Sequence, residues 1–351
     1  MRVLTLHGAG DMRLEERPVP SAGAGQMVVK IEYAGICGTD VEFFHGLLPP
    51  FMKYPILPGH ENVGVVTETG DGVKGFEPGD RLICGPPGFC REMCPSCREG
   101  KANICRNAFP GRTAGFGVLD GGYAEYLLIN DAEHTSLVKI PDNVDMKDAV
   151  LFDVICVAVH AIKGSRFKIG DNVVVSGAGS IGLSVVQFLK AGGANKVIVL
   201  DIVDESEQIV KQYGGDFLIN TAGCEDVAGA VKELLGSDTG ADIVFECAGA
   251  PESFTNCVSC VKPGGQLVCV GTILKPVTFV PAAFHPGEPD FHYSFVYTEA
   301  DIKTYMDLLA AGKVSFPGMV TGVFSMENVV EEYFGAKDRK GHIKALISPN
   351  L

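Results

Sequence analysis

The feature that most constrains this chain is a glycine-rich stretch at residues 172–201, NVVVSGAGSIGLSVVQFLKAGGANKVIVLD. A short β-branched strand precedes Gly177, Gly179 and Gly182 in G-x-G-x-x-G spacing, and a helical run and a second strand ending at Asp201 follow. The first glycine permits a tight turn, the second leaves room for a pyrophosphate, and the third lets helix and strand pack closely. The stretch predicts a dinucleotide-binding βαβ unit.

Asp201, at the expected end of the second strand, favours NAD as the dinucleotide. A carboxylate there accepts hydrogen bonds from a ribose 2′-hydroxyl, whereas a 2′-phosphate would face an acid and no nearby arginine. Ser180 and Ile181 begin the expected helix, where backbone amides bind phosphate groups. The alternative is a glycine-rich turn in another α/β fold, and the strand, helix and acid around the turn disfavour it.

Strands and helices alternate after residue 171, which predicts βαβ crossovers and a parallel sheet covered on both faces. We expect an α/β fold in which this part forms a Rossmann doubly wound sheet. The expected strands are 173–176, 196–201, 217–219, 242–247, 266–271 and 292–297, and the expected helices are about 180–191, 205–213, 225–235 and 251–261, the last closed by Pro263-Gly264-Gly265.

The residues before this alternation predict a different, mostly β domain. Short β-branched runs between Gly, Pro and Asp turns occur at 26–33, 62–69, 81–84 and 123–129. An apolar helix within 148–167 leads out of this domain, and the chain is expected to return to it through helices 299–311 and 326–334 and strands 319–324 and 343–347. We therefore predict one domain from residues 1–153 and 298–351 and another from residues 154–297.

Charge and hydropathy exclude some classes of partner. The 351 residues carry 29 basic and 43 acidic side chains, and the net charge of −14 argues against nucleic acid or an anionic membrane surface. No stretch reaches the ~18 uncharged apolar residues of a membrane helix. Residues 1–4 begin a strand-like run rather than a charged segment followed by an apolar one, so we expect no signal peptide and a cytoplasmic location.

Four of the 12 cysteines fall within a short stretch and predict a metal site. Cys90, Cys94, Cys97 and Cys105 form C-x₃-C-x₂-C-x₇-C, and four thiolates around one zinc ion make a closed, tetrahedral, structural site. Such a site would stabilise a loop that has few apolar residues of its own. Other cysteines are expected to be small buried hydrophobic residues: Cys247, Cys257, Cys260 and Cys269.

Two short motifs of the first domain contain further zinc-ligand types, GICGTD at 35–40 and GHE at 59–61. A catalytic zinc ion takes three protein ligands and keeps one position open for water or substrate. Cys37 and His60 could supply a thiolate and an imidazole. Taken singly, Cys37 is more readily explained as a buried cysteine and His60 as a hydrogen-bonded core histidine.

GICGTD, GHE, the four-cysteine lobe, an apolar crossover helix and VSGAGSIG occur in this order, and together they resemble the zinc-dependent medium-chain alcohol dehydrogenases. Within that family the pattern is similar to the polyol and threonine dehydrogenase branch, and the resemblance covers essentially the whole chain. It implies a GroES-like catalytic domain, an NAD-binding Rossmann domain, catalytic and structural zinc ions, and a homodimer or homotetramer.

The resemblance also implies roles for individual residues. Cys37 and His60 match the ligands of the catalytic zinc, and Glu61 matches a residue that lies beside the metal and can ligate it. Asp40 matches a carboxylate that holds the ligand histidine. Thr39 matches a hydroxyl that hydrogen-bonds the substrate alcohol and passes on its proton.

A further zinc ligand is expected at the start of the crossover helix, where Asp153 and Cys156 are rivals one helical turn apart. We favour Asp153, because an unpaired carboxylate in the apolar run LFDVICVAV would be costly, whereas a metal ion would neutralise it. The alternative is a carboxylate that caps the helix.

Other positions follow the resemblance less closely. Val270 and Thr272 match residues that line the nicotinamide end of the cofactor site. Glu42 stands where many relatives carry a proton-relay histidine, and His45 follows three residues later. Either His45 takes over the relay, or protons leave through water, or His45 is a solvated loop residue.

The activity that the resemblance implies is hydride transfer between NAD and the secondary alcohol of a polyol or sugar-like substrate, with the zinc ion as Lewis acid. One alternative is the oxidation of an amino alcohol such as threonine, since FDVICVAVHA looks like its counterpart in threonine dehydrogenases. Another, of a different class, is a zinc- and nucleotide-binding module without turnover.

Overall fold

The computed structural model describes residues 1–85, 88–90, 93–108, 112–336 and 342–351. The chain divides into two compact units. The first unit comprises Met1–Asp153, Tyr297–Ala310 and Pro317–Leu351, and the second comprises Val154–Val296 and Ala311–Phe316. The boundary at Asp153 falls in the first turn of the apolar helix α4 (Phe152–Gly164), so this helix starts in one unit and continues in the other.

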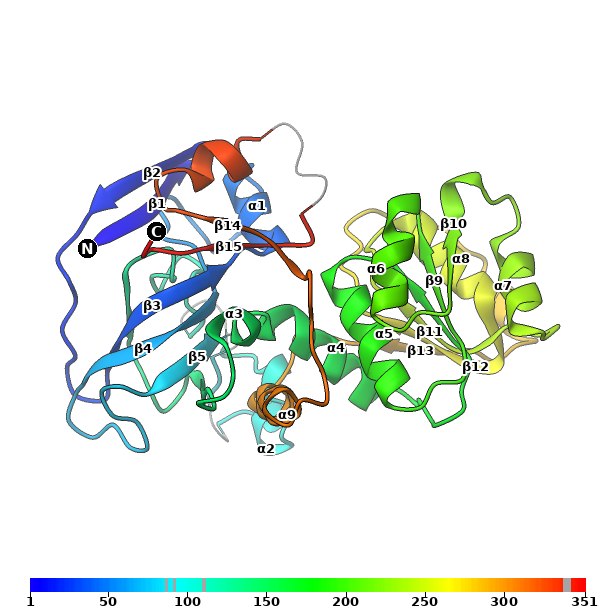
Figure 1. Ribbon diagram of the computed structural model, residues 1–351, viewed down its shortest axis with the longest axis horizontal. Helices are drawn as coiled ribbons and strands as arrows, with labels where there is room; N and C mark the ends of the chain where they lie inside the picture. Colours follow the sequence, from blue (N-terminus) through cyan, green and yellow to red (C-terminus); the bar gives the residue numbers. More distant parts are fainter. Residues whose placement is uncertain (86–87, 91–92, 109–111, 337–341) are drawn as a thin grey trace. The chain divides into compact units, whose positions relative to one another are not determined.

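The second unit contains a six-stranded, all-parallel sheet in the order β10-β9-β8-β11-β12-β13 (Figure 1). This is the doubly wound Rossmann order, which confirms the predicted α/β fold. The strands are β8 (Val173–Ser176), β9 (Val197–Asp201), β10 (Phe217–Asn220), β11 (Ala241–Glu246), β12 (Val261–Cys269) and β13 (Asp290–Tyr293).

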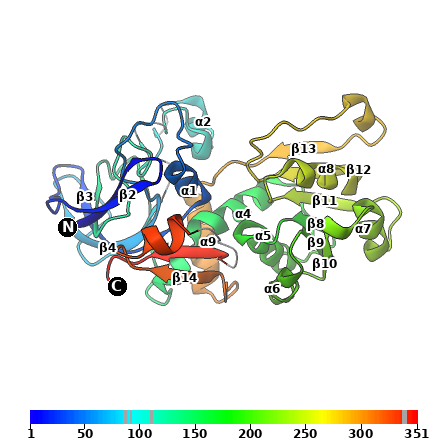
Figure 2. The same cartoon turned by 90° about the horizontal axis from the view of Figure 1, so that it is seen from above.

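Helices cover this sheet, as the view from above shows (Figure 2). The α-helices are α5 (Ser180–Ala191), α6 (Glu207–Gln212), α7 (Val227–Leu235) and α8 (Pro251–Cys260), and short 3₁₀ turns are η2 (Asp204–Ser206), η3 (Thr221–Gly223) and η4 (Pro281–Phe284). Helices α7 and α8 bury Val231, Leu235 and Phe254 against strand residues such as Val174 and Val244. The inner strands are largely apolar because helices cover both faces of the sheet and bury the side chains on each face.

Two expectations for this sheet were wrong in detail. Pro263-Gly264-Gly265 does not separate α8 from its strand, because β12 already begins at Val261 and takes in the three residues as an irregularity in its pairing with β11. The sixth strand ends at Tyr293 rather than at residue 297. Tyr293 pairs with Cys269, the last residue of β12, so β13 ends where its neighbouring strand ends.

The first unit is mostly β, as the sequence predicts. A seven-stranded sheet runs β14-β15-β3-β4-β5-β7 with β6 also paired to β3, and β1 and β2 form a separate hairpin. The strands are β1 (Arg2–Gly8), β2 (Asp11–Glu16), β3 (Met27–Gly35), β4 (Glu61–Thr69), β5 (Arg81–Gly85), β6 (Tyr126–Ile129), β7 (Ser136–Lys139), β14 (Val320–Phe324) and β15 (Lys344–Ile347). Leu4, Ile31, Leu82 and Tyr123 are among its fully buried side chains.

Short helices complete the first unit. They are α1 (Gly38–Phe44), α2 (Pro95–Arg98), η1 (Ala102–Ile104), α3 (Met146–Ala149), α9 (Glu299–Ala310) and η5 (Val330–Phe334). The expected helix at 326–334 is instead a turn followed by the single π-helical turn η5, in which the Gly335 amide reaches back five residues to the Val330 carbonyl at 2.8 Å. Among the described residues, no helix has both the length and the apolar character that a membrane crossing needs.

The glycine-rich turn after β8 has the tight geometry that its spacing predicts. Gly177 has a φ of 103°, a conformation that disfavours any side chain. A Cβ on Gly182 would lie 1.8 Å from the Gly177 carbonyl oxygen, so helix α5 can approach the turn only through a glycine. A Cβ on Gly179 would meet no atom within 4 Å.

Substitution by alanine should lower the free energy of unfolding by different amounts at Gly182 and Gly179. Gly182→Ala should lower the free energy of unfolding by about 1–3 kcal/mol, because the new methyl group forces the turn and helix apart. Gly179→Ala is the matched control, since its Cβ points into open space and its φ of −77° suits alanine. Urea denaturation of both variants tests this, and equal stability of the two would contradict it.

Candidate functional site

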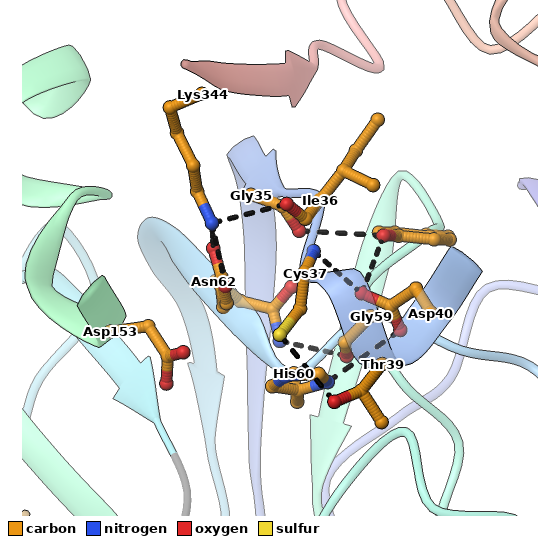
Figure 3. Close-up of polar contacts among 12 residues, drawn as sticks. Gly35, Ile36, Cys37, Thr39, Asp40, Gly59, His60, Asn62, Asp153 and Lys344 are labelled. Carbon is orange, nitrogen blue, oxygen red and sulfur yellow. Dashed lines mark hydrogen bonds and ion pairs between the residues drawn. The ribbon is translucent and has the colours of Figure 1, made fainter. Parts of the chain in front are cut away.

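Four side chains of the first unit converge into one cluster, Cys37, His60, Glu61 and Asp153. Each offers one ligand atom, and these atoms all lie within 4.8 Å of one another. Figure 3 shows Cys37 and His60 in the middle of the site, with Asp153 approaching from the side away from Asp40. We call these four residues the metal cluster.

Strand pairing explains why these residues meet. Strands β3 and β4 are antiparallel, and their register sets Gly35 opposite Glu61. Cys37, two residues past Gly35, therefore lies beside His60, the residue before β4. A Cβ on Gly35 would fall 1.9 Å from Glu61 Oε2, so the first glycine of GICGTD makes room for the carboxylate. Asp153 joins from the first turn of α4, whereas Cys156 lies outside the group.

Asp40 orients the ligand histidine. Its carboxylate is fully buried, accepts hydrogen bonds at Oδ2 from the Cys37 amide at 3.0 Å and the Tyr123 hydroxyl at 2.9 Å, and presents Oδ1 to His60 Nδ1 at 3.6 Å. Burial alone lowers the pKa of His60, but the Asp40 carboxylate raises it well above its usual range. Because Nδ1 faces Asp40, Nε2 is the ring nitrogen left for a metal ion.

Glu61 is held by a lysine from the last strand. Lys344 is 4% exposed, and its Nζ donates hydrogen bonds to Glu61 Oε1 at 2.7 Å and to the Ile36 carbonyl at 3.1 Å. Burial raises the pKa of Glu61 to about 7, although the Lys344 ammonium opposes this rise. The pair is fully enclosed, and removing either partner would leave a buried charge without compensation.

The remaining predicted residues of this region lie around the cluster. Thr39 Oγ1 is 3.7 Å from Cys37 Sγ, in the first turn of α1. Glu42 is half-buried on the same helix, and His45 is exposed at its C-terminal end. An exposed position suits a solvated loop histidine as well as a proton relay.

The donor set fits a zinc ion. One thiolate, one imidazole nitrogen and carboxylate oxygens are the ligand types that zinc takes in catalytic sites. Two buried atoms of the site, Asp40 Oδ1 and His60 Nδ1, have no hydrogen bond within the described part of the chain. A cation on the far side of the ring would stabilise this histidine–carboxylate pair.

The four cysteines of the predicted structural site also meet. Sγ of Cys90 lies 3.7 Å from Sγ of Cys97, and Sγ of Cys94 lies 3.9 Å from Sγ of Cys105. Zinc–sulfur bonds of about 2.3 Å in a tetrahedron give sulfur–sulfur edges of about 3.8 Å. Cys90 therefore joins the other three cysteines of the lobe, although three residues separate it from Cys94.

The thiols of this lobe ionise unequally. Burial opposes ionisation of Cys90, but hydrogen bonds from Asn107 and the other three thiols lower its pKa to about 6. Burial raises the pKa of Cys97 to about 12. A metal ion that binds all four as thiolates must therefore displace protons, so its affinity should fall at low pH.

Two features near the glycine-rich turn of the second unit bear on nucleotide binding. Helix α5 begins after Gly179 without a side-chain cap, which leaves backbone amides at Ser180 and Ile181 for an anion. Asp201, at the end of β9, accepts hydrogen bonds from the amides of Ala178 at 2.5 Å, Ile202 at 2.7 Å and Val203 at 3.0 Å. Asp201 therefore also holds the glycine-rich turn in place.

Val270 and Thr272 follow the last residue of β12. The Val270 amide donates to the Glu246 carbonyl at 2.9 Å. Glu246 is fully buried, and its Oε1 accepts from the Gly249 amide at 2.8 Å and the Ser253 hydroxyl at 2.7 Å. The ends of β11 and β12 are thus tied together beside the predicted cofactor site.

The cysteines outside the lobe that were expected to be buried are buried, except for Cys247, which is half-buried.

Sequence reasoning missed the residues that support the cluster, Tyr123, Tyr297 and Lys344. Each is distant in sequence from the residue it contacts, and no motif includes it. Only Lys344 carried a signal, as a charged residue inside the short apolar strand KALI.

Comparisons with known proteins agree with this geometry. Residues 23–142 match the family model of the alcohol dehydrogenase GroES-like domain, and residues 180–311 match that of the zinc-binding dehydrogenases. "Probable D-xylulose reductase A" of Arthroderma otae is 34% identical over 98% of this chain and 96% of its own length. Sorbitol dehydrogenase 1 of Saccharomyces cerevisiae is 32% identical over 94% and 92%. A protein from Sinorhizobium meliloti, solved bound to NADP, has a TM-score of 0.89 at 27% identity over 99% of both chains.

The four-cysteine lobe predicts that replacing one of its cysteines lowers the metal content of the protein. Cys97→Ala should remove one metal ion per chain and lower the thermal midpoint, because three thiolates hold zinc far less tightly than four. Cys257→Ala is the control, since this fully buried cysteine of α8 lies outside both clusters. Elemental analysis of the purified variants measures the metal, and a wild-type metal content in Cys97→Ala would contradict the assignment.

Proposed function

The chain belongs to the zinc-dependent medium-chain alcohol dehydrogenase family, in its polyol branch, and we propose that it interconverts a polyol and the corresponding ketose by hydride transfer with NAD. The observation that carries the proposal is the convergence of Cys37, His60, Glu61 and Asp153 within 4.8 Å. The relatives that act on xylulose and sorbitol support a substrate with several hydroxyl groups.

Cys37, His60 and Asp153 would hold the zinc ion, with Glu61 beside it. When bound, zinc supplies the Lewis acidity that lowers the pKa of an alcohol, and NAD supplies the hydride acceptor. The Thr39 hydroxyl would hydrogen-bond the substrate alcohol and pass its proton on by releasing its own proton toward solvent. Asp40 fixes the His60 ring, and Lys344 keeps one oxygen of Glu61 occupied, so that neither side chain must reorganise during turnover.

We assign cofactor binding to the second unit. The open amides at the start of α5 suit a pyrophosphate, and Val270 and Thr272 are proposed to line the nicotinamide end. Asp201 favours NAD over NADP, because a carboxylate at the end of β9 accepts a ribose hydroxyl and repels a phosphate.

We further propose the domain roles and the assembly that the resemblance implies. Residues 1–153 and 298–351 would form the GroES-like catalytic domain, and residues 154–297 the NAD-binding domain. The protein would be a homodimer or homotetramer. The outer strand β13 carries the exposed Tyr293, at 72%, and is followed by the exposed Phe295, at 54%, which suits a contact with a second copy.

Asp153→Ala tests the proposed reaction at the ligand that the sequence left open. We expect the variant to lose the ion of the metal cluster and to form NADH from polyols more than about 100-fold more slowly. Even substitution of residues that only hydrogen-bond the metal ligands lowers metal affinity or activity by about 10–100-fold. Cys156→Ala, one helical turn away, should keep both metal and turnover. NADH formation is followed with xylitol, sorbitol and threonine. If the wild type oxidises threonine alone, the substrate is an amino alcohol and not a polyol. If it oxidises none of these alcohols, the protein is the zinc- and nucleotide-binding module without turnover.

The nucleotide preference predicts the behaviour of Asp201→Asn. The amide keeps one acceptor oxygen for the backbone amides but loses the other oxygen and the charge, so the affinity ratio of NADH to NADPH should fall by about tenfold or more. Asp204→Asn, which removes an exposed charge from the same loop, is the control. Fluorescence titration with both nucleotides measures the ratio. An equal change in both variants would mean that net charge, and not contact with the ribose, sets the preference.

A further inference from the structure

Tyr297 contacts the metal cluster directly, although no sequence motif includes it. Its side chain is fully buried, and its hydroxyl donates a hydrogen bond of 2.5 Å to Oδ1 of Asp153. A carboxylate has two oxygens, so a hydroxyl on Oδ1 leaves Oδ2 available to a metal ion. The partners are 144 positions apart in the sequence.

Packing holds the tyrosine ring beside Asp153. It packs edge-on against the ring of Phe152, with centroids 6.1 Å apart and planes at 84°. Phe152 is itself fully buried and lies against the backbone of Gly85, where a Cβ would come within 2.5 Å of its ring. The Tyr297 ring thus packs against Phe152, which packs in turn against Gly85 at the end of β5.

The backbone before Tyr297 is strained in a way that supports a specific role. Val296 has a φ of 54°, a left-handed conformation that is costly for a β-branched residue. Such strain persists only where the surrounding structure over-determines the conformation, and it gathers at functional positions. Here the strained residue directly precedes the buried, hydrogen-bonded tyrosine.

The chain topology gives the bond a second consequence. The chain leaves the first unit after Asp153 and re-enters it at Tyr297. The hydrogen bond therefore joins the residue after which the chain first leaves the first unit to the residue at which it first returns. The bond thus links the two ends of the segment 154–296 within the first unit.

We propose that Tyr297 is a positioning residue that holds the Asp153 carboxylate in the metal cluster and so selects Asp153 over Cys156 as the ligand from α4. The inference rests on the proposed function, because it requires a metal ion at Cys37 and His60. Without the hydroxyl, Asp153 in the first helical turn can adopt other rotamers or bind water. The metal ion then loses a pre-organised ligand.

The test is release of zinc from the purified holoenzyme to a colorimetric chelator. The wild type should release two ions per chain in two phases, one from each cluster. Tyr297→Phe keeps the ring but removes the hydroxyl, and it should speed release from one phase by about 10- to 100-fold. The phase that Cys97→Ala abolishes belongs to the four-cysteine lobe, and its rate should not change.

Tyr305→Phe is the matched control. Tyr305 is equally buried in the first unit, and its hydroxyl donates at 2.7 Å to the backbone carbonyl of Asp148, outside the metal cluster. Its zinc release should match the wild type. Cobalt-substituted protein gives a second readout, because Tyr297→Phe should shift the visible absorption of the catalytic ion and Tyr305→Phe should not.

Several results would overturn the inference. They are unchanged release and an unchanged cobalt spectrum in Tyr297→Phe, equal acceleration of both phases, or the same acceleration in Tyr305→Phe. A wild type that holds only the ion of the four-cysteine lobe would instead refute the proposed function. The metal content of the unmodified protein therefore separates the two failures.

Discussion

Burial of charge at the start of β4 is the constraint on which the first unit depends. Asp40, His60, Glu61 and Lys344 are each at most 5% exposed. Isolated charges are not tolerated in such an interior, so each must face an opposite charge or a hydrogen-bond donor. Lys344 comes from the last strand, and the need to neutralise Glu61 thereby fixes β15 against β3, to which it is paired. The return of the C-terminal segment is thus part of the site's electrostatics.

The second unit depends on a different constraint, the close approach of backbone to backbone. Gly182 lets α5 reach the turn at Gly177, and the Asp201 carboxylate then ties that turn to the end of β9 through the Ala178 amide. A single acid serves both the shape of the turn and, in our proposal, the choice of nucleotide. The two roles are compatible because a carboxylate has more acceptor positions than backbone amides fill.

The sequence predicts those parts of the fold whose information is local. The six-stranded sheet and its helices follow from alternating short apolar runs and glycines, and the metal-ligand types follow from compact motifs. It fails where tertiary context decides. The end of β13 depends on where β12 stops, and the π-helical turn at 330–334 replaces a helix that the pattern alone suggests. The sequence does not predict the roles of Tyr123, Tyr297 and Lys344, because a contact between distant residues leaves no pattern in the sequence near either partner.

The rivalry of Asp153 and Cys156 shows what kind of information is lacking. Both lie on one apolar helix, a single turn apart, and both are chemically suitable ligands. In our proposal, the difference lies in Tyr297, which follows the strained Val296 and donates a hydrogen bond to Asp153. In our proposal, the ligand that α4 contributes thus depends on a residue 144 positions away in the sequence.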